Sequence, residues 1–228
     1  MSSVTASTAD TNFSSRASLD PNDDRLGTTN YAIRDRVLAS LTFKFALIKR
    51  FDTKVALHYE GRSGRPYSFI FGTDVNGDSS SYDNDLFYVP TGRDDPNVRW
   101  ADAKQADAFF AYLDANPALK RFSGRVVPRN SETSYYQHRY DLKFTQEIPL
   151  RGRVKGELFL DMINVANLLN KDWGRVYAAS FPYGLAVANA SYDPTANQYI
   201  YRYTEAKAQT LQISPSCWQM QGGARVKF

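Results

Sequence analysis

Residues Trp218 to Phe228 read WQMQGGARVKF and alternate between an apolar and a polar face. The apolar face carries Trp218, Met220, Gly222, Ala224, Val226 and Phe228, and the polar face carries Gln219, Gln221, Gly223, Arg225 and Lys227. Alternation with period 2 predicts a strand with one apolar and one wet surface. A strand of ~9–11 residues spans a bilayer when it is tilted in a barrel. The stretch therefore suits the closing strand of an outer-membrane β-barrel, and equally the last strand of a soluble sandwich.

Four earlier segments alternate in the same way, and they cover residues 37–45, 54–61, 136–145 and 154–162. Odd-numbered residues form the apolar face in the first two segments, and even-numbered residues form it in the other two and in the terminal strand. We therefore expect five neighbouring antiparallel strands, with these apolar faces turned outward.

The lengths of the links between the strands distinguish an outer-membrane barrel from a soluble sandwich. Links 46–52 and 146–153 are short, whereas links 62–135 and 163–217 are long. Structureless loops beyond ~12–15 residues are uncommon in compact soluble domains, and short turns alternating with long loops are typical of outer-membrane barrels. The predicted fold is therefore all-β, a partial antiparallel transmembrane β-barrel of about five long strands with long extracellular loops. The first, third and fifth strands should run from the outside to the periplasm.

The long links contain structure of their own. In the first, Phe69–Phe71 should extend the second strand beyond the membrane, and Asp85–Val89 should form a short returning strand. Ala101–Leu113 has apolar residues at helical spacing before Asn116-Pro117, which predicts a short helix. In the second link, Gln198–Thr204 alternates like a hairpin strand.

Composition limits the function classes. The 228 residues are 43% hydrophobic and 14% aromatic, with a net charge of +4 and a mean hydropathy of −0.49. No apolar run approaches the ~20 residues of a transmembrane helix, and the scattered charges predict no nucleic-acid partner. The single cysteine, Cys217, excludes an intrachain disulfide. The N-terminal residues lack the basic and apolar regions of a secretory signal.

Several segments, in this order, resemble the C-terminal barrel region of TonB-dependent outer-membrane transporters of the Oar-like group. They are NYAIRDRVLASLTFKF, GRSGRPYSFIFGTDVNGDSSSYDNDLFYVP, RFSGRVVPRNSETSYYQHRYDLKFTQEIP, DMINVANLLNKDWGR and SCWQMQGGARVKF. The resemblance implies a barrel of about 22 strands with an N-terminal plug, which imports bulky ligands with energy from the TonB complex.

The resemblance gives a domain organisation and a location. Residues 1–34 would be the remnant of an extracellular loop, and residues 35–228 the C-terminal receptor barrel segment in the bacterial outer membrane. We expect a fragment of the transporter whose wall contacts outer-membrane lipid and whose surface loops face the ligand. The plug and the other strands would be its partners, and the TonB complex would act through those missing parts. The alternative is a soluble or surface-attached β-rich binding module without transport.

The C-terminal strand carries a second implication of the resemblance. Its terminal aromatic Phe228, together with Val226 and Trp218, resembles the signal that the outer-membrane insertion machinery recognises. We therefore expect these side chains to direct assembly.

The stretch DVNGDSSSYDND offers a candidate metal site. Asp74, Asn76, Asp78 and Asp85 stand at positions 1, 3, 5 and 12, as the ligands of a calcium loop do. Ser79 occupies the position of the usual glycine, and Asp85 replaces the usual glutamate. The alternative is a polar turn in a solvated loop.

Catalytic and transition-metal patterns are weak. His58 and His138 stand alone on opposite predicted strand faces, without a nearby thiolate. The chain has no GxSxG nucleophile elbow, so we expect no enzyme activity. Asp161, Asn164, Asn167, Asn170 and Trp173 cluster after the fourth strand, where we expect them to turn and cap the chain.

Overall fold

A computed structural model describes residues 15–22, 26–79, 84–150, 154–205 and 209–227. The chain is 47% strand and 13% helix, which confirms the mostly-β class, and the described residues form no closed barrel. It divides into two compact units. The sheet unit comprises Ile33–Gly64, Tyr135–Tyr177 and Leu211–Phe228, and the core unit comprises Met1–Ala32, Arg65–Ser134 and Ala178–Thr210.

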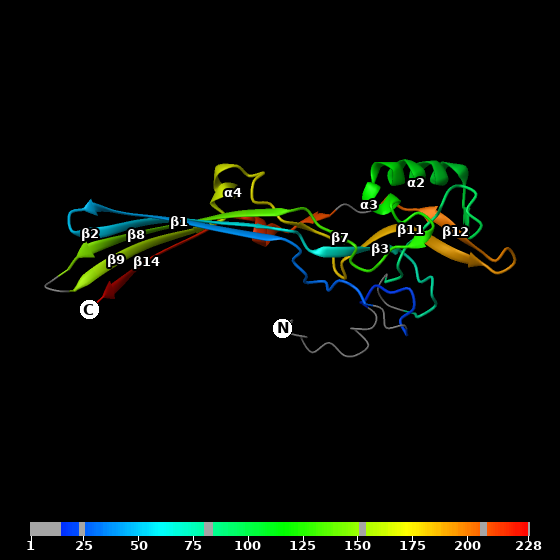
Figure 1. Ribbon diagram of the computed structural model, residues 1–228, viewed down its shortest axis with the longest axis horizontal. Coiled ribbons are helices and arrows are strands. Elements are labelled where there is room, and N and C mark those ends of the chain that lie inside the picture. The colour runs from blue at the N-terminus through cyan, green and yellow to red at the C-terminus, as the bar shows by residue number, and fades with distance from the viewer. Residues whose placement is uncertain (1–14, 23–25, 80–83, 151–153, 206–208, 228) are drawn as a thin grey trace. The chain divides into compact units, whose positions relative to one another are not determined.

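The sheet unit contains one five-stranded antiparallel sheet, which Figure 1 shows as a single layer. Its strand order is β1-β2-β8-β9-β14. The bounds are β1 Arg36–Ile48, β2 Phe51–Arg62, β8 Gln137–Pro149, β9 Lys155–Ile163 and β14 Gln219–Lys227. The five predicted strands and their neighbouring antiparallel order are therefore confirmed.

The strand ends differ from the prediction at the first turn. β1 continues to Ile48, which pairs with Phe51, so the predicted link 46–52 shrinks to a tight turn at residues 49–50. Pairing between the two strands of the hairpin extends both of them beyond the residues in which apolar and polar side chains alternate.

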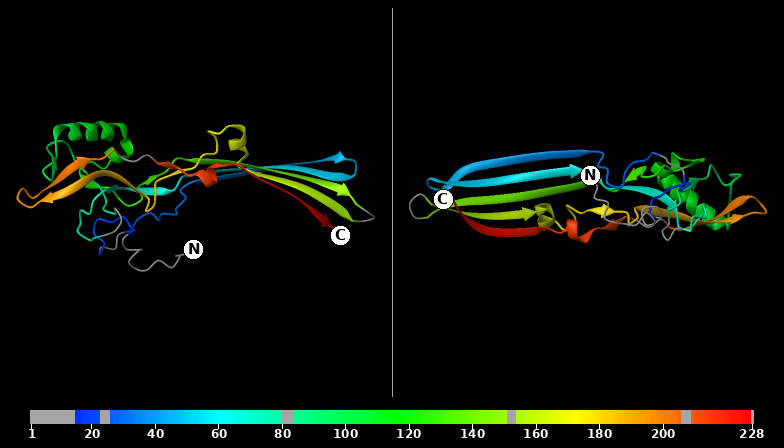
Figure 2. Two further views of the ribbon diagram at one scale, coloured as in Figure 1. Left: turned by 180° about the vertical axis from the view of Figure 1, so that it is seen from behind. Right: turned by 90° about the horizontal axis from the view of Figure 1, so that it is seen from below.

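Every link to the core unit leaves from the same end of this sheet. Arg36, Arg62 and Gln137 are paired partners at that end of β1, β2 and β8. Ile163 pairs with Gln219 at the same end of β9 and β14. Figure 2 shows the five strands running side by side, with the C-terminus at the opposite end.

The core unit is built on a second, mixed sheet with strand order β5-β12-β11-β3-β7. Its bounds are β3 Pro66–Phe71, β5 Val98–Trp100, β7 Glu132–Thr133, β11 Gly184–Asp193 and β12 Gln198–Tyr203. β11 pairs in parallel with β3, and β12 pairs in parallel with β5. The prediction that Phe69–Phe71 extends the second strand is wrong. β3 instead joins this separate sheet between β11 and β7, and all six of its residues are buried there.

Helix α2 (Ala103–Ala115) packs on β12 and β5, and confirms the predicted helix with its start shifted by two residues. Asp102 sets the start, because its carboxylate accepts the backbone N–H of Gln105 at 2.9 Å. Phe109 and Leu113 project from α2 into a buried apolar cluster with Phe87, which directly precedes β4, and with Tyr201 of β12. Every buried residue of that cluster lies in the core unit.

Short elements complete the chain. They are β4 Tyr88–Val89, α3 Pro117–Lys120, β6 Arg125–Val126, α4 Val165–Leu169, β10 Tyr177–Ala178, β13 Thr210–Leu211 and α5 Ile213–Ser216. The predicted returning strand Asp85–Val89 is shortened to β4, since Asp85 and Leu86 form only isolated bridges.

Candidate functional site

The five strands of the sheet unit share one apolar face. Direct partners in an antiparallel ladder lie on the same face, and the ladder joins Phe43, Val55, Phe144, Leu160 and Gly222 in one row. The neighbouring row joins Leu41, Leu57, Leu142, Met162 and Met220. The register therefore confirms that the predicted odd-numbered and even-numbered apolar sets fall on a single surface.

This apolar face is exposed. Leu41 is 53%, Phe43 58%, Met220 52% and Val226 53% exposed. A sheet normally buries its apolar face against another layer. Among the described residues, the five strands of the sheet unit contribute nothing to the buried apolar cluster. In the described part of the chain, the apolar face of the sheet unit therefore has no protein layer packed on it.

The opposite face carries cross-strand ion pairs. Glu60 on β2 lies 2.9 Å from Arg36 on β1 and 3.5 Å from Arg139 on β8. Lys143 on β8 pairs with Asp161 on β9 at 2.9 Å. The charges therefore form a continuous polar surface across several strands.

On the same polar face, Glu157 forms ion pairs near the C-terminal end of β14. It pairs with Arg225 at 3.2 Å and also with Lys227. Arg225 stacks over the ring of Phe159 at 4.8 Å. Gly223 makes room for that ring, since a Cβ on Gly223 would lie 2.5 Å from it.

Aromatic side chains gather on the apolar face near the end from which the long links leave. Tyr59 and Tyr140 make a tilted ring contact with centroids 4.9 Å apart, and the hydroxyl of Tyr59 lies 2.8 Å from Nδ1 of His138. Tyr136 and Trp173 border the same region and line a cavity of about 720 Å³ beside α4. Aromatic rings with polar tips are typical of a membrane interface.

The turn after β9 is held by amide side chains, as the sequence predicted. Asn164 adopts a left-handed backbone conformation at φ 54° and is 1% exposed. Its Nδ2 donates to the carbonyls of Gly174 and Ser216 at 3.0 and 2.9 Å. A Cβ at Gly174 would lie 2.0 Å from Asn164 Oδ1, so this close approach requires glycine.

The other residues of the predicted exit cluster act locally. Asn167 donates to the carbonyls of Lys171 and Trp173, both at 3.0 Å. Asn170 Oδ1 accepts the backbone N–H of Asp172 at 2.9 Å. These contacts cap and close the turn, whereas Asp161 faces the polar surface.

Two of the three expected assembly-signal residues lie in the described part of the chain. Val226 is on the apolar face of β14, and Trp218 directly precedes that strand and is 44% exposed. Phe228 lies outside the described residues. Their recognition by the insertion machinery stays a prediction.

The predicted calcium stretch forms a loop closed by its own carboxylates. Asp74 accepts the backbone N–H groups of Gly77 and Ser79 at 2.7 and 2.9 Å. Asn76 Oδ1 accepts the N–H of Asp78 at 2.9 Å. Within the described ranges, no three His, Cys, Asp or Glu side chains lie close enough to hold a metal. These bonds fit the polar-turn alternative, and calcium binding stays a prediction.

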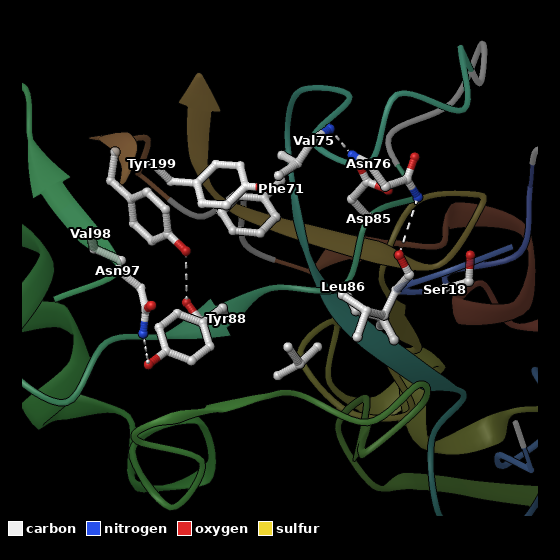
Figure 3. A pocket seen from close by; sticks show the side chains of 13 residues that line it. Ser18, Phe71, Val75, Asn76, Asp85, Leu86, Tyr88, Asn97, Val98 and Tyr199 are labelled. Carbon is white, nitrogen blue, oxygen red and sulfur yellow. Dashed lines mark hydrogen bonds between the residues drawn. The ribbon is translucent and has the colours of Figure 1, made fainter. Parts of the chain in front are cut away.

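Asp85 behaves differently from the other loop carboxylates because it is 3% exposed. Its Oδ2 accepts the backbone N–H groups of Val75 and Asn76. Burial raises the pKa of Asp85 above its ordinary value, although these two hydrogen bonds oppose the shift. Asp85 lies on the wall of a cavity of about 360 Å³ in the core unit (Figure 3).

A second buried carboxylate, Asp95, was not singled out by the sequence patterns. Its oxygens accept the N–H groups of Thr91 and Asn97 at 2.8 and 2.9 Å, and the hydroxyl of Tyr88 at 3.0 Å. Burial alone would raise its pKa, but these hydrogen bonds hold the pKa of Asp95 below its ordinary value. The Asp-Asp-Pro-Asn turn was the available signal, since Asp side chains commonly bond backbone two residues on.

The two histidines lie on opposite faces of the sheet, as predicted. His58 Nδ1 lies 2.9 Å from the hydroxyl of Ser40 on the polar face, and His138 belongs to the aromatic group on the apolar face. Cys217 is exposed.

No helix among the described residues is long and apolar enough to cross a membrane. No protein-family model, curated protein or solved structure matches this chain. The described residues combine a one-layer sheet that has an exposed apolar face with a core unit that has a buried cluster and a cavity.

Proposed function

We propose that this chain supplies part of the wall of an outer-membrane active transporter of the TonB-dependent, Oar-like group. The observation that carries the proposal is the single-layer sheet unit, whose apolar face is exposed along all five strands. Burying a Leu or Phe side chain contributes about 1.5–3 kcal/mol, so leaving this face in water is unfavourable. Lipid hydrocarbon would cover it without a second protein layer.

The dimensions and chemistry of the sheet support this proposal. Its strands contain 9 to 13 residues, and a tilted strand of ~9–11 residues crosses the hydrocarbon core. The ion-paired face would then line the lumen, which is polar in such barrels. The aromatic group around Tyr59 and Tyr140 would lie at the outer interface.

The two edge strands of the sheet need further strands to pair with. Among the described residues, β1 and β14 each pair with one neighbour only. Unpaired backbone groups in hydrocarbon cost several kcal/mol each. Further strands must therefore pair with both edges, and the plug and the TonB complex would act through that larger assembly. The core unit would contribute the ligand-facing surface outside the membrane.

A second candidate function is a soluble or surface-attached β-rich binding module. The observation that favours it is the core unit, which has its own buried cluster and a cavity. In that case another protein layer would cover the apolar face of the sheet.

Membrane extraction separates the two candidates. The chain is expressed behind a secretion signal in a Gram-negative host together with the strands that complete the barrel, and outer membranes are washed with high salt and then with sodium carbonate. The transporter proposal predicts that the chain stays in the outer-membrane pellet and is released only by detergent. Release by the washes, or a monodisperse chain in detergent-free buffer, would contradict the proposal and favour the binding module.

A further inference from the structure

The cavity of the core unit has one charged wall residue. It encloses about 360 Å³ and is bordered by the aromatic rings of Phe71, Tyr88 and Tyr199. Asp85 is the sole ionisable acid or base among its described lining residues other than tyrosine. In its ionised form this buried carboxylate gives the cavity a negative potential, and a cationic group beside it would favour that ionised form.

Two buried polar atoms on this wall lack partners. Oδ1 of Asp85 and Oγ of Ser18 have no hydrogen bond to any described residue. Asp85 is 3% and Ser18 9% exposed. The backbone holds the two residues side by side, because Leu86 donates its N–H to the carbonyl of Ser18 at 3.1 Å. Buried polar groups normally have a partner, so these two atoms mark a place for a ligand group.

The rest of the cavity suits a compact apolar or aromatic skeleton. In Figure 3, Ser18 and Asp85 lie at one side of the view, Tyr88 and Asn97 lie at the other, and Phe71 lies between them. Pockets of this size with few convergent polar groups commonly bind small molecules. Aromatic faces also attract cations.

We propose that this cavity binds a small organic ammonium ligand. Its ammonium group donates hydrogen bonds to Oδ1 of Asp85 and to Oγ of Ser18, and its carbon skeleton packs on Phe71, Leu86 and Tyr199. The ammonium supplies both the missing donor and the missing positive charge. A neutral alcohol supplies a donor without the charge. Calcium needs six to eight oxygen ligands, more than Asp85 and Ser18 provide.

This site is separate from the proposed membrane role, because all of its residues belong to the core unit. Failure of ligand binding would leave the extraction result unchanged. Conversely, a chain released by the membrane washes could still bind the ammonium ligand.

The test uses the full chain in a non-ionic detergent and the probe tyramine, with detergent alone as the blank. Tyrosol is the matched neutral probe, since a hydroxyl replaces the ammonium. Methyl glucoside tests a sugar, and calcium chloride tests competition for Asp85. Calorimetry measures affinity, and amide chemical shifts of Ser18, Asp85 and Leu86 report the place of binding.

We expect tyramine to shift these amides and to bind at least tenfold more tightly than tyrosol or the glucoside. Asp85→Asn keeps the shape but removes the charge, and should weaken tyramine at least tenfold. Ser18→Ala should weaken it several-fold. Asp94→Asn is the matched control, because Asp94 is exposed and outside the cavity wall, and should leave affinity unchanged.

Several results would overturn the proposal. They are no shift at these amides, equal affinity for tyramine and tyrosol, preferential binding of the glucoside, or an Asp85→Asn chain that binds like the wild type. Amide dispersion shows whether each variant is folded. If Asp85→Asn does not fold, the comparison of tyramine with tyrosol on the wild-type chain decides alone.

Discussion

Substitution of Leu41 by arginine tests which solvent covers the apolar face. Leu41 lies near the middle of β1, is 53% exposed and pairs with Leu57. In water an exposed Leu→Arg change should alter stability by less than about 0.5 kcal/mol. At the midplane of a bilayer the same change costs about 2–4 kcal/mol. That cost lowers the folding equilibrium roughly 30- to 700-fold, at 1.4 kcal/mol for each factor of ten.

Thr42→Arg provides the matched control. Thr42 follows Leu41 on the same strand, pairs with Ala56 and points to the polar face. Urea unfolding is followed by tryptophan fluorescence, to which Trp100, Trp173 and Trp218 all contribute. The chain is assembled with the strands that complete the barrel, in detergent micelles and in lipid vesicles. Leu41→Arg should lower the unfolding free energy by about 2–4 kcal/mol and Thr42→Arg by less than about 1. Equal losses, or a larger loss for Thr42→Arg, would refute the assignment of the faces.

Three further predictions concern the turns and loops. Asn164→Ala should lower the free energy of unfolding by about 2–4 kcal/mol, because it removes one buried and one partly buried hydrogen bond and places alanine in a left-handed backbone conformation. Asn164→Gly should cost less, and equal losses measured by urea unfolding would show that backbone strain is unimportant there. The depressed pKa of Asp95 predicts stability that is complete above its ordinary pKa of 3.8 and lost as the pH falls through the lower folded value. Acid titration of thermal stability should therefore show a steeper loss for the wild type than for Asp95→Asn, and parallel curves would contradict this. Calcium should bind the loop 74–85 with millimolar affinity, and calorimetry of the full chain without a calcium-dependent signal would end that prediction.

The sheet unit could be predicted from the sequence because its pattern is local. Each strand alternates with period 2, and consecutive strands pair in order. Leu41 and Leu160 could therefore be assigned to the same face of the sheet from the sequence. The strand ends were less predictable. Ile48 pairs with Phe51 through the backbone of a tight turn, and this pairing leaves little trace in the apolar pattern.

The core unit could not be predicted in the same way because its contacts are distant in sequence. β3 pairs in parallel with β11, and β5 with β12, across long stretches of chain. A short buried apolar run such as Pro66–Phe71 does not show which sheet it will enter. The division between an N-terminal loop 1–34 and a barrel segment 35–228 stays a functional prediction, whereas the compact units group residues from three stretches each.

The candidate cavity depends on the same distant contacts. Asp85 was singled out through the calcium-like spacing, but Ser18 came from a Ser/Thr-rich stretch without a recognisable motif. The bridge between them forms only when residues far apart along the chain meet. The missing partner of each side chain is visible only in three dimensions.

Spin-label accessibility tests the central claim, that lipid covers the apolar face of the sheet unit. Labels are placed singly at Leu41, Leu160 and Lys143 in the chain reconstituted in outer-membrane lipid together with the strands that complete the barrel. Collisions with oxygen, which concentrates in hydrocarbon, are compared with collisions with a water-soluble nickel chelate. Labels at Leu41 and Leu160 should favour oxygen, and the label at Lys143, which pairs with Asp161 on the other face, should favour the chelate. The reverse pattern, or chelate access at all three positions, would contradict the account.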